Sequence, residues 1–307
     1  MKNNPVKIIA GPCSINYENL DEIYKIAEIK INGKFAIWGT RVVGLKSRTN
    51  LNKSGKGMGI DFFDYFKLKK RFLKTKKLNI KKVKFPSIEL AKKIVKETKL
   101  LVATEIMDPW LQLPIYEQNI PPEKLMIWNP AVNQLGWPIK VMADFVKKNK
   151  WYLGIKNPKW LGDKLKKVNN LKNKNQTSME KTWEGLVSYA DLDPERIFLI
   201  HRGVDIPEKR NYRNAPVHFL AQKVKQKTGC LLFFDPSHSH GPIMREKILP
   251  ATIKAMKMKI NDKNYLYDGI LIEAGNSETD TEQHISLKEL EILVKEISKF
   301  REIQFRE

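Results

Sequence analysis

A stretch of cationic side chains, Phe35–Asn50, is the part of this sequence best suited to chemistry. It reads FAIWGTRVVGLKSRTN and contains Arg41, Lys46 and Arg48, while no carboxylate occurs from residue 35 to residue 60. An arginine can hold a phosphate or carboxylate through two parallel hydrogen bonds, and a lysine adds a point charge. The stretch therefore suits a small, highly charged anion, although a solvated basic loop would have the same composition.

A second group of residues offers ligands for a divalent metal ion. A thiol, an imidazole and two carboxylates are supplied by Cys13, His238, Glu273 and Asp280. Together these ligands suit Zn, Fe, Co or Mn. Their spacing along the chain does not match a local metal-binding motif. A lone cysteine is often only a small buried residue, and His240 could be the ligand in place of His238. The group is therefore a hypothesis that depends on the fold.

Eight short apolar runs have the composition of β-strands, and each is followed by a segment long enough for a helix. The runs are Val6–Ala10, Phe35–Trp38, Leu100–Ala103, Lys124–Trp128, Trp151–Ile155, Arg196–Ile200, Cys230–Phe234 and Tyr267–Ile272. Helices are predicted at Tyr17–Ile31, Ser87–Thr98, Pro138–Lys148, Thr177–Tyr189 and Ser286–Phe300, with a serine cap at the second and a T-x-x-E capping box at the fourth.

This alternation predicts an α/β protein, a single (β/α)8 TIM barrel over residues 1–307 without a separate regulatory domain. A doubly wound open sheet is the alternative, but no G-x-G-x-x-G follows any strand.

Polar side chains follow nearly every predicted strand. They are Cys13, Arg41, Glu105, Asp108, Asn129, Lys156, Arg202, Asp235, His238 and Glu273. In a (β/α)8 barrel the active site lies at the C-terminal ends of the strands, so these residues would meet at one rim. Four cations of this region, Arg41, Lys46, Lys156 and Arg202, form a plausible site for a phosphate plus a carboxylate. The alternative is structural ion pairing with Glu105 or Asp108.

Three further features leave alternatives open. The charged loop Asn211–Asn214, with Arg210 before it, could be a lid or a plain surface loop. His201 could face the site or the barrel wall. We assign no role to His218 or His284.

The chain is strongly basic, with 56 Lys and Arg against 34 Asp and Glu and a net charge of +22. The excess is densest at Lys67–Lys84 and Lys164–Lys174, and the first run predicts a helix with a solvated basic face. No zinc-finger or RNP-like motif occurs, so we expect no specific nucleic-acid partner. Two cysteines, no signal peptide and no membrane-length apolar run favour a cytoplasmic protein with no membrane partner.

Short motifs occur in one order along nearly the whole chain. They are AGPCS at Ala10–Ser14, R-x4-KSRT at Arg41–Thr49, ATEIMD at Ala103–Asp108, GIKNP at Gly154–Pro158, IHRG at Ile200–Gly203, EKRNYRN at Glu208–Asn214, DPSH at Asp235–His238 and DGILIEA at Asp268–Ala274. The set resembles the class I 3-deoxy-D-arabino-heptulosonate 7-phosphate (DAHP) synthases, metal-dependent (β/α)8-barrel enzymes of the 3-deoxy-ulosonate synthase superfamily. It is most similar to the forms fused to chorismate mutase, a domain that we expect to be absent here.

The resemblance implies condensation of phosphoenolpyruvate (PEP) with erythrose 4-phosphate, the first step of the shikimate pathway to the aromatic amino acids. It implies a divalent metal held by Cys13, His238, Glu273 and Asp280. PEP would be bound by Arg41, Lys46, Lys156 and Arg202, and the aldose phosphate would meet Lys46, Arg48 and Thr49. Lys46, Glu105, Lys156 and Arg202 are the expected catalytic residues, and Glu105 is also expected to contact substrate. Relatives form dimers or tetramers, so a homo-oligomer is expected.

Three departures from the family pattern bear on this expectation. Ser47 replaces the proline of K-P-R-T, and Glu273 and Asp280 are closer together in sequence than the metal Glu and Asp of the family. Ala131, in WNPAVNQ, stands where the family has the phosphate-binding arginine of G-A-R-T. Either another cation such as Arg210 or Arg213 substitutes, or the aldose differs, or the protein is a non-catalytic metabolite-binding paralogue. The superfamily also contains 3-deoxy-octulosonate 8-phosphate synthases, which have an N-R-S-type motif where this chain has KSRT. The KSRT motif therefore favours the heptulosonate enzyme.

Overall fold

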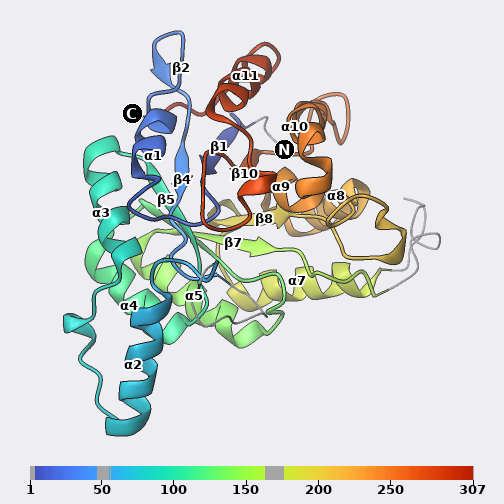
Figure 1. Cartoon of the computed structure of the whole chain (residues 1–307). Coiled ribbons are helices and arrows are strands. Elements are labelled where there is room, and N and C mark those ends of the chain that lie inside the picture. Colours follow the sequence, from blue (N-terminus) through green and yellow to red (C-terminus); the bar gives the residue numbers. More distant parts are fainter. Residues whose placement is uncertain (1–3, 47–54, 56, 163–175, 307) are drawn as a thin grey trace.

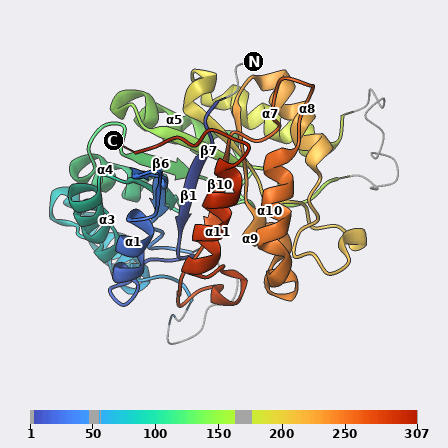
Figure 2. The ribbon, with the colours of Figure 1, turned by 90° about the horizontal axis from the view of Figure 1, so that it is seen from above.

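Eight parallel strands close into a barrel in the computed structural model, which describes residues 4–46, 55, 57–162 and 176–306. Around the barrel the order is β1-β10-β9-β8-β7-β6-β5-β4. The strands are β1 (Lys7–Gly11), β4 (Gly39–Arg41), β5 (Leu101–Glu105), β6 (Leu125–Trp128), β7 (Tyr152–Lys156), β8 (Ile197–His201), β9 (Leu231–Phe234) and β10 (Gly269–Glu273). Helices surround the strands (Figure 2). The predicted TIM barrel is confirmed.

The first and last strands close the barrel, because β1 pairs with β10 in register from Lys7↔Gly269 to Gly11↔Glu273. Inside the barrel lies an apolar layer made by Ile9, Val43, Leu101, Ala103, Met126, Trp128, Phe198, Ile200, Phe233 and Leu271. This packing makes the interior a core rather than a pore. Polar chemistry is thereby confined to the ends of the strands.

Helices cover the outside of the barrel. They are α1 (Leu20–Ala27), α2 (Phe62–Thr75), α3 (Pro86–Thr98), α4 (Pro109–Asn119), α5 (Gly136–Asn149), α7 (Ser178–Ala190), α8 (His218–Thr228), α9 (Pro236–His240), α10 (Ile248–Lys257) and α11 (Leu287–Ser298), with short 3-10 turns η1 (Ile80–Lys82), η2 (Pro194–Arg196), η3 (Pro207–Lys209), η4 (Pro242–Lys247) and η5 (Thr281–Gln283). The predicted capping box begins α7 at Thr177, and a second one begins α11 at Ser286. Each box satisfies backbone N–H groups that a helix start leaves unpaired. No described helix is long and apolar enough to cross a bilayer.

The prediction for the second strand is wrong by several residues. Phe35 belongs to an antiparallel hairpin of β2 (Lys30–Ile31) and β3 (Lys34–Phe35), and the barrel strand starts only at Gly39. A Cβ at Gly39 would lie 3.0 Å from the carbonyl oxygen of Leu101 on the neighbouring strand. Gly39 is therefore part of the sheet at a close approach of two strands, and it does not end the strand. As a result Arg41 lies within the strand rather than after it.

The predicted serine cap of α3 is also wrong. The helix begins at Pro86 with Phe85 as its N-cap, and Ser87 instead donates its backbone N–H and its hydroxyl to the buried carboxylate of Asp61. Asp61 directly precedes α2, which projects from the barrel (Figure 1) and has no buried side chain. The expected solvated basic helix is thus confirmed, whereas the lysine-rich run Lys164–Lys174 lies outside the described residues.

Candidate functional site

A cavity of about 370 Å³ opens at the C-terminal ends of the strands. Its walls hold six cations and three carboxylates, together with small and neutral groups: Lys46, Glu105, Ala131, Val132, Lys156, Lys159, Arg202, Asp205, Lys209, Arg213, Asn214, His238 and Asp280. Four predicted catalytic residues, Lys46, Glu105, Lys156 and Arg202, are therefore brought together. Arg48 and Thr49 lie outside the described residues, so their predicted contact with the aldose phosphate stays a prediction.

Two of the cavity cations are buried without a direct ion-pair partner among the described residues. Lys46 is 8% exposed and Arg202 is 7% exposed, and neither side chain forms an ion pair with another described residue. A buried cation is costly unless an anion compensates it. Carboxylates further away, such as Glu105, compensate these charges only in part, so both side chains are available to an anionic ligand.

A third cation is held by a carboxylate. The Lys156 Nζ atom lies 3.4 Å from Glu105 Oε1, and both side chains are buried. Burial would raise the pKa of the Glu105 carboxyl, but Lys156 and Lys46 outweigh burial and lower this pKa to about 2. Glu105 is consequently charged at neutral pH, and its Oε2 atom has no hydrogen-bond partner among the described residues. This oxygen is the one available to a ligand.

Arg41 lies beneath the cavity rather than in its wall. Its guanidinium donates to the carbonyls of Pro12 and Cys13 and, over 2.9 Å, to Glu273 Oε1. Both Arg41 and Lys156 stack over the ring of Trp128, each 5.4 Å from its centroid. Only Nη1 of Arg41 is without a partner among the described residues. Binding of PEP by Arg41 stays a prediction that rests on this one nitrogen.

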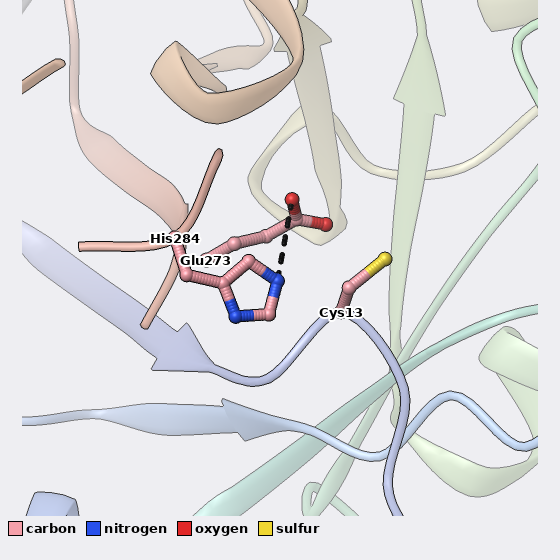
Figure 3. A group of neighbouring side chains, drawn as sticks. All are labelled: Cys13, Glu273 and His284. Atoms are coloured by element: carbon pink, nitrogen blue, oxygen red, sulfur yellow. Dashed lines mark ion pairs between the residues drawn. The ribbon is translucent and has the colours of Figure 1, made fainter. Parts of the chain in front are cut away.

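A thiol, a carboxylate and an imidazole lie close together (Figure 3). One ligand atom each from Cys13, Glu273 and His284 lies within 4.8 Å of the others, and all three residues are buried. Cys13 follows β1 and Glu273 ends β10, which are neighbours in the barrel. The chain then turns through η5 and returns, so that the N–H of Ile285 donates to the Glu273 carbonyl. This return places His284 against Glu273.

The other two predicted metal ligands lie at the edge of this group. The His238 ring donates from Nδ1 to the Asp235 carboxylate, and its Nε2 atom lies 3.7 Å from Glu273 Oε1. Asp280 Oδ2 lies 3.8 Å from the Cys13 sulfur. His284 was missed at the sequence level, where it received no role. The family spacing, which asked for a ligand further from Glu273 than Asp280, was the signal that could have found it.

The residues present fit a borderline divalent metal. Their donors are a soft thiolate, imidazoles and carboxylates, which suit Zn, Fe, Co or Mn. Burial, with a further contribution from Glu273, raises the pKa of the Cys13 thiol to about 11, so the free site keeps this proton. A coordinated divalent cation deprotonates such a thiol outright. The buried Nε2 atom of His284 also lacks a hydrogen-bond partner among the described residues.

Several predicted rim residues serve the scaffold instead. His201 faces the wall, where Nδ1 pairs with the Tyr267 hydroxyl and Nε2 accepts from the N–H of Val217. Asp108 caps α4 and pairs with Tyr65 and Lys69 of α2.

Asn129 accepts from the N–H of Lys156 and donates to the Asn133 carbonyl. Its amide is therefore used within the protein, and it fixes the backbone under Lys156.

Three cavity residues had no role at the sequence level. Asp205 lies between two lysines, with Lys209 Nζ at 2.5 Å and Lys159 Nζ at 3.4 Å. The hydrogen bond from Lys209 is the largest cause of a lowered pKa at the Asp205 carboxyl. The loop residue Arg213 lines the same cavity as Ala131, whereas Arg210 lines only a neighbouring cavity of about 380 Å³. No sequence pattern indicated that Lys159 and Asp205 would face the site.

Solved structures with this fold include an enzyme from Thermotoga maritima described as phospho-2-dehydro-3-deoxyheptonate aldolase (DAHP synthase). The two share 17% sequence identity at a TM-score of 0.66, over 97% of this chain and 69% of that one. A truncated 3-deoxy-D-arabino-heptulosonate 7-phosphate synthase from the same organism matches with a TM-score of 0.62 and 17% identity, over 97% of this chain and 87% of the other. The likeness is one of fold. No family model matches the chain, and no curated protein matches it in sequence.

Proposed function

We propose that the chain catalyses a metal-assisted, aldol-type condensation of PEP with an aldose phosphate, with erythrose 4-phosphate as the acceptor and DAHP as the product. The observation that carries this proposal is two buried cations, Lys46 and Arg202, which form no ion pair with another described residue and line a cavity next to the Cys13, Glu273 and His284 donors. Anion-binding cations beside a divalent metal site suit a phosphorylated acid that reacts with a carbonyl compound. The shared fold with DAHP synthase is consistent with this reaction.

The cations bind and orient PEP. Arg202 and Lys46 compensate its phosphate and carboxylate charges, and Lys156 adds a third positive charge fixed by Glu105 and Trp128. Holding both reactants in one cavity lowers the entropic part of the barrier. The bond forms between the PEP vinyl carbon and the aldehyde carbon, water adds at the resulting cationic carbon, and phosphate leaves.

Three protons move in this reaction. The aldehyde oxygen gains one as the carbon–carbon bond forms, and the attacking water loses one. The hydroxyl of the resulting hemiketal phosphate gives the third to the phosphate as the carbon–oxygen bond to phosphate breaks and the ketone forms. The Lys156 ammonium and the Glu105 carboxylate form a 3.4 Å pair in the cavity wall and are placed to give the first and take the second. The metal, when bound, supplies Lewis acidity toward the aldehyde carbonyl. Cys13, Glu273 and the neighbouring imidazoles would hold it.

A related synthase that acts on a different aldose is the second candidate function. Ala131 and Val132 line the cavity where the resemblance implies a phosphate-binding arginine, so one phosphate contact of the family is lacking. A charge-assisted hydrogen bond contributes about 1.5–3 kcal/mol, enough to change which substrate is preferred. Lys159, Lys209 and Arg213 are the cavity cations that could take over.

One assay tests the proposal and separates the candidates. Phosphate release from PEP is measured with Mn, Fe, Co or Zn, across erythrose 4-phosphate, other aldose phosphates and the corresponding free aldoses. We expect release only with a metal and an aldose, fastest with erythrose 4-phosphate, and loss of release with excess chelator. A preference for another aldose would favour the second candidate. No release with any aldose, together with no PEP binding at millimolar ligand, would refute both in favour of a non-catalytic paralogue.

A further inference from the structure

Two imidazoles approach opposite oxygens of one buried carboxylate. His284 Nε2 lies 3.8 Å from Glu273 Oε2, and His238 Nε2 lies 3.7 Å from Glu273 Oε1. In each ring the other nitrogen is already used. His284 Nδ1 lies 2.6 Å from the carbonyl oxygen of Gly275, and His238 Nδ1 donates to the Asp235 carboxylate. Because a carbonyl oxygen can only accept, the hydrogen of neutral His284 is on Nδ1 and its Nε2 carries a lone pair.

This arrangement points a ring-nitrogen lone pair at the Glu273 carboxylate. The Nε2 lone pair of His284 faces a carboxylate oxygen in a buried setting, and no described hydrogen-bond donor satisfies that nitrogen. The carboxylate oxygens of Glu273 accept hydrogen bonds from Arg41 and Gln283, so His284 Nε2 is the atom left without a donor. A buried acceptor that lacks a donor and faces an anion is costly, so a cation between the two groups would be strongly favoured. Donor atoms around one metal are about 3–4 Å apart, given bond lengths of about 2.0–2.3 Å. The separations of 3.7 and 3.8 Å fit that requirement.

An imidazole whose Nδ1–H is bound to a carbonyl or carboxylate is the usual form of a metal-ligating histidine. The bound Nδ1 fixes both the tautomer and the direction of the ring, which leaves Nε2 for the metal. His238 and His284 both meet this description. Cys13 and Glu273 form one compact group with His284, and His238, whose Nε2 atom lies 3.7 Å from Glu273 Oε1, would be the fourth donor.

Asp280 lies between the metal group and a cation. Its Oδ2 atom is 3.8 Å from the Cys13 sulfur and 3.4 Å from Arg213 Nη1, and its backbone has a left-handed φ of +51° at the start of η5. Asp280 lines both the substrate cavity and the neighbouring one, whereas the compact group of donors contains His284 and not Asp280. The Arg213 guanidinium also donates to Gln283, whose amide in turn donates to Glu273 Oε2. Asp280 is thus part of the wall that holds Arg213 beside the site.

We propose that His284, in place of Asp280, is the fourth metal ligand with Cys13, His238 and Glu273, and that Asp280 anchors Arg213 in the cavity wall. This inference rests on the proposed function in one respect, which is that the protein binds a divalent metal. A thiolate with two imidazoles and one carboxylate is softer than a set with two carboxylates. It therefore selects Zn²⁺, Fe²⁺ or Co²⁺ over Mn²⁺ and Mg²⁺.

The test is titration of the protein with Co²⁺, without substrate, monitored by the thiolate-to-cobalt charge-transfer band and the visible d–d bands. We expect tight binding to the parent protein, and about a tenfold or greater loss of affinity in His284→Ala. Asp280→Asn should bind within about threefold of the parent and keep the d–d spectrum. His240→Ala is the matched control, since its buried ring also binds a carbonyl through Nδ1, that of Pro236. It should leave Co²⁺ affinity unchanged.

A second variant separates ligand loss from misfolding. His284→Asp supplies a carboxylate at the same position, so it should regain Co²⁺ binding with altered d–d bands and should shift preference toward Mn²⁺. Circular dichroism checks that each variant is folded.

The assignment is overturned if Asp280→Asn loses the metal while His284→Ala keeps it, or if the parent binds no Co²⁺. Co²⁺ binding through His284 without phosphate release from PEP would instead refute the proposed reaction and leave the metal assignment standing.

Discussion

Arg202 is the side chain whose removal should most directly affect PEP binding. It is buried at the cavity wall with no ion-pair partner among the described residues, so its charge serves a ligand more than the fold. Arg202→Ala should weaken PEP binding by about 1.5–3 kcal/mol, or roughly 10–150-fold, with little change in melting temperature. Isothermal titration calorimetry and thermal unfolding measure the two effects.

The matched control for that experiment is Arg301→Ala. Arg301 is also 7% exposed. Its guanidinium donates to the carbonyls of Met256, Tyr267 and Asn4, so its role is structural. This variant should lower the melting temperature without changing PEP affinity. If Arg202→Ala instead lowers the melting temperature and leaves PEP affinity unchanged, Arg202 is structural and the proposed anion site is wrong.

Substitutions at Ala131 test which cavity cation takes the place of the phosphate-binding arginine that the resemblance implies. Arg213 lines the same cavity as Ala131, whereas Arg210 lines only its neighbour, so the structure separates two cations that the sequence could not rank. The effects of Ala131→Arg and Arg213→Ala on PEP affinity should be non-additive by about 0.5–3 kcal/mol, because groups that bind one ligand are coupled. Ala131→Arg and Arg210→Ala should combine additively. A double-mutant cycle that shows coupling to Arg210 instead would reverse this assignment.

Which side chains line the cavity was predictable from the sequence only where strand ends could be located, and their catalytic roles stay predictions. Lys46, Glu105, Lys156 and Arg202 line one cavity because strand ends meet at one rim. His284 was not predictable in this way, since it reaches the site on a segment that turns back after β10 and pairs with it. Such a return leaves no periodic pattern in the sequence.

At the scale of elements, Asp61 joins the start of α2 to the start of α3 and should make stability depend on pH. Burial, opposed by hydrogen bonds from Ser87, raises the pKa of the Asp61 carboxyl from 3.8 to about 6. Between these values the folded protein binds more protons at this site than the unfolded chain does, so the free energy of unfolding falls as pH rises from about 4 to about 6. The contribution lost is about 3 kcal/mol at 1.36 kcal/mol per pKa unit.

Asp61→Asn should abolish this decline, because an amide does not ionise. Denaturant unfolding at several pH values between about 4 and 7 measures the effect. Asp64→Asn removes a charge from the same helix at a half-buried position and is the control, which should keep the decline. An unchanged pH profile in Asp61→Asn would show that the carboxyl titrates normally in the folded protein.

Strand positions could be predicted from apolar runs for most of the barrel, but the second strand shows where the rule fails. Phe35–Trp38 has the composition of a buried strand, yet Phe35 pairs with Lys30 in a hairpin outside the barrel. The glycine read as a strand end, Gly39, is required by the close approach of the Leu101 carbonyl. Composition cannot distinguish a glycine that ends a strand from one that permits tight strand packing.

For the molecule as a whole, the excess positive charge should make substrate binding depend on salt. The net charge is +22, and the cavity walls carry six cations against three carboxylates. Raising the ionic strength from about 0.05 M to about 0.5 M should lower PEP affinity and the on-rate, because screening weakens the field that attracts an anion. Affinity for an uncharged aldose is the control and should change little. Equal salt dependence for both would show that the field of the cavity does not act on PEP.

The closure of the barrel by its first and last strands has a consequence for how the protein is made. β1 forms a five-residue ladder with β10 but has only the pair Ile9↔Gly39 with β4. On the ribosome β1 emerges before every other barrel strand, and it must wait until β10, the last of them, has been made to pair with its main partner, an ordering typical of slow, non-local folding. Cys13 comes from the early part of the chain, and Glu273 and His284 come from the late part. A metal ion that needs all three would therefore bind only a finished barrel, and it would hold the nascent protein in that state by mass action.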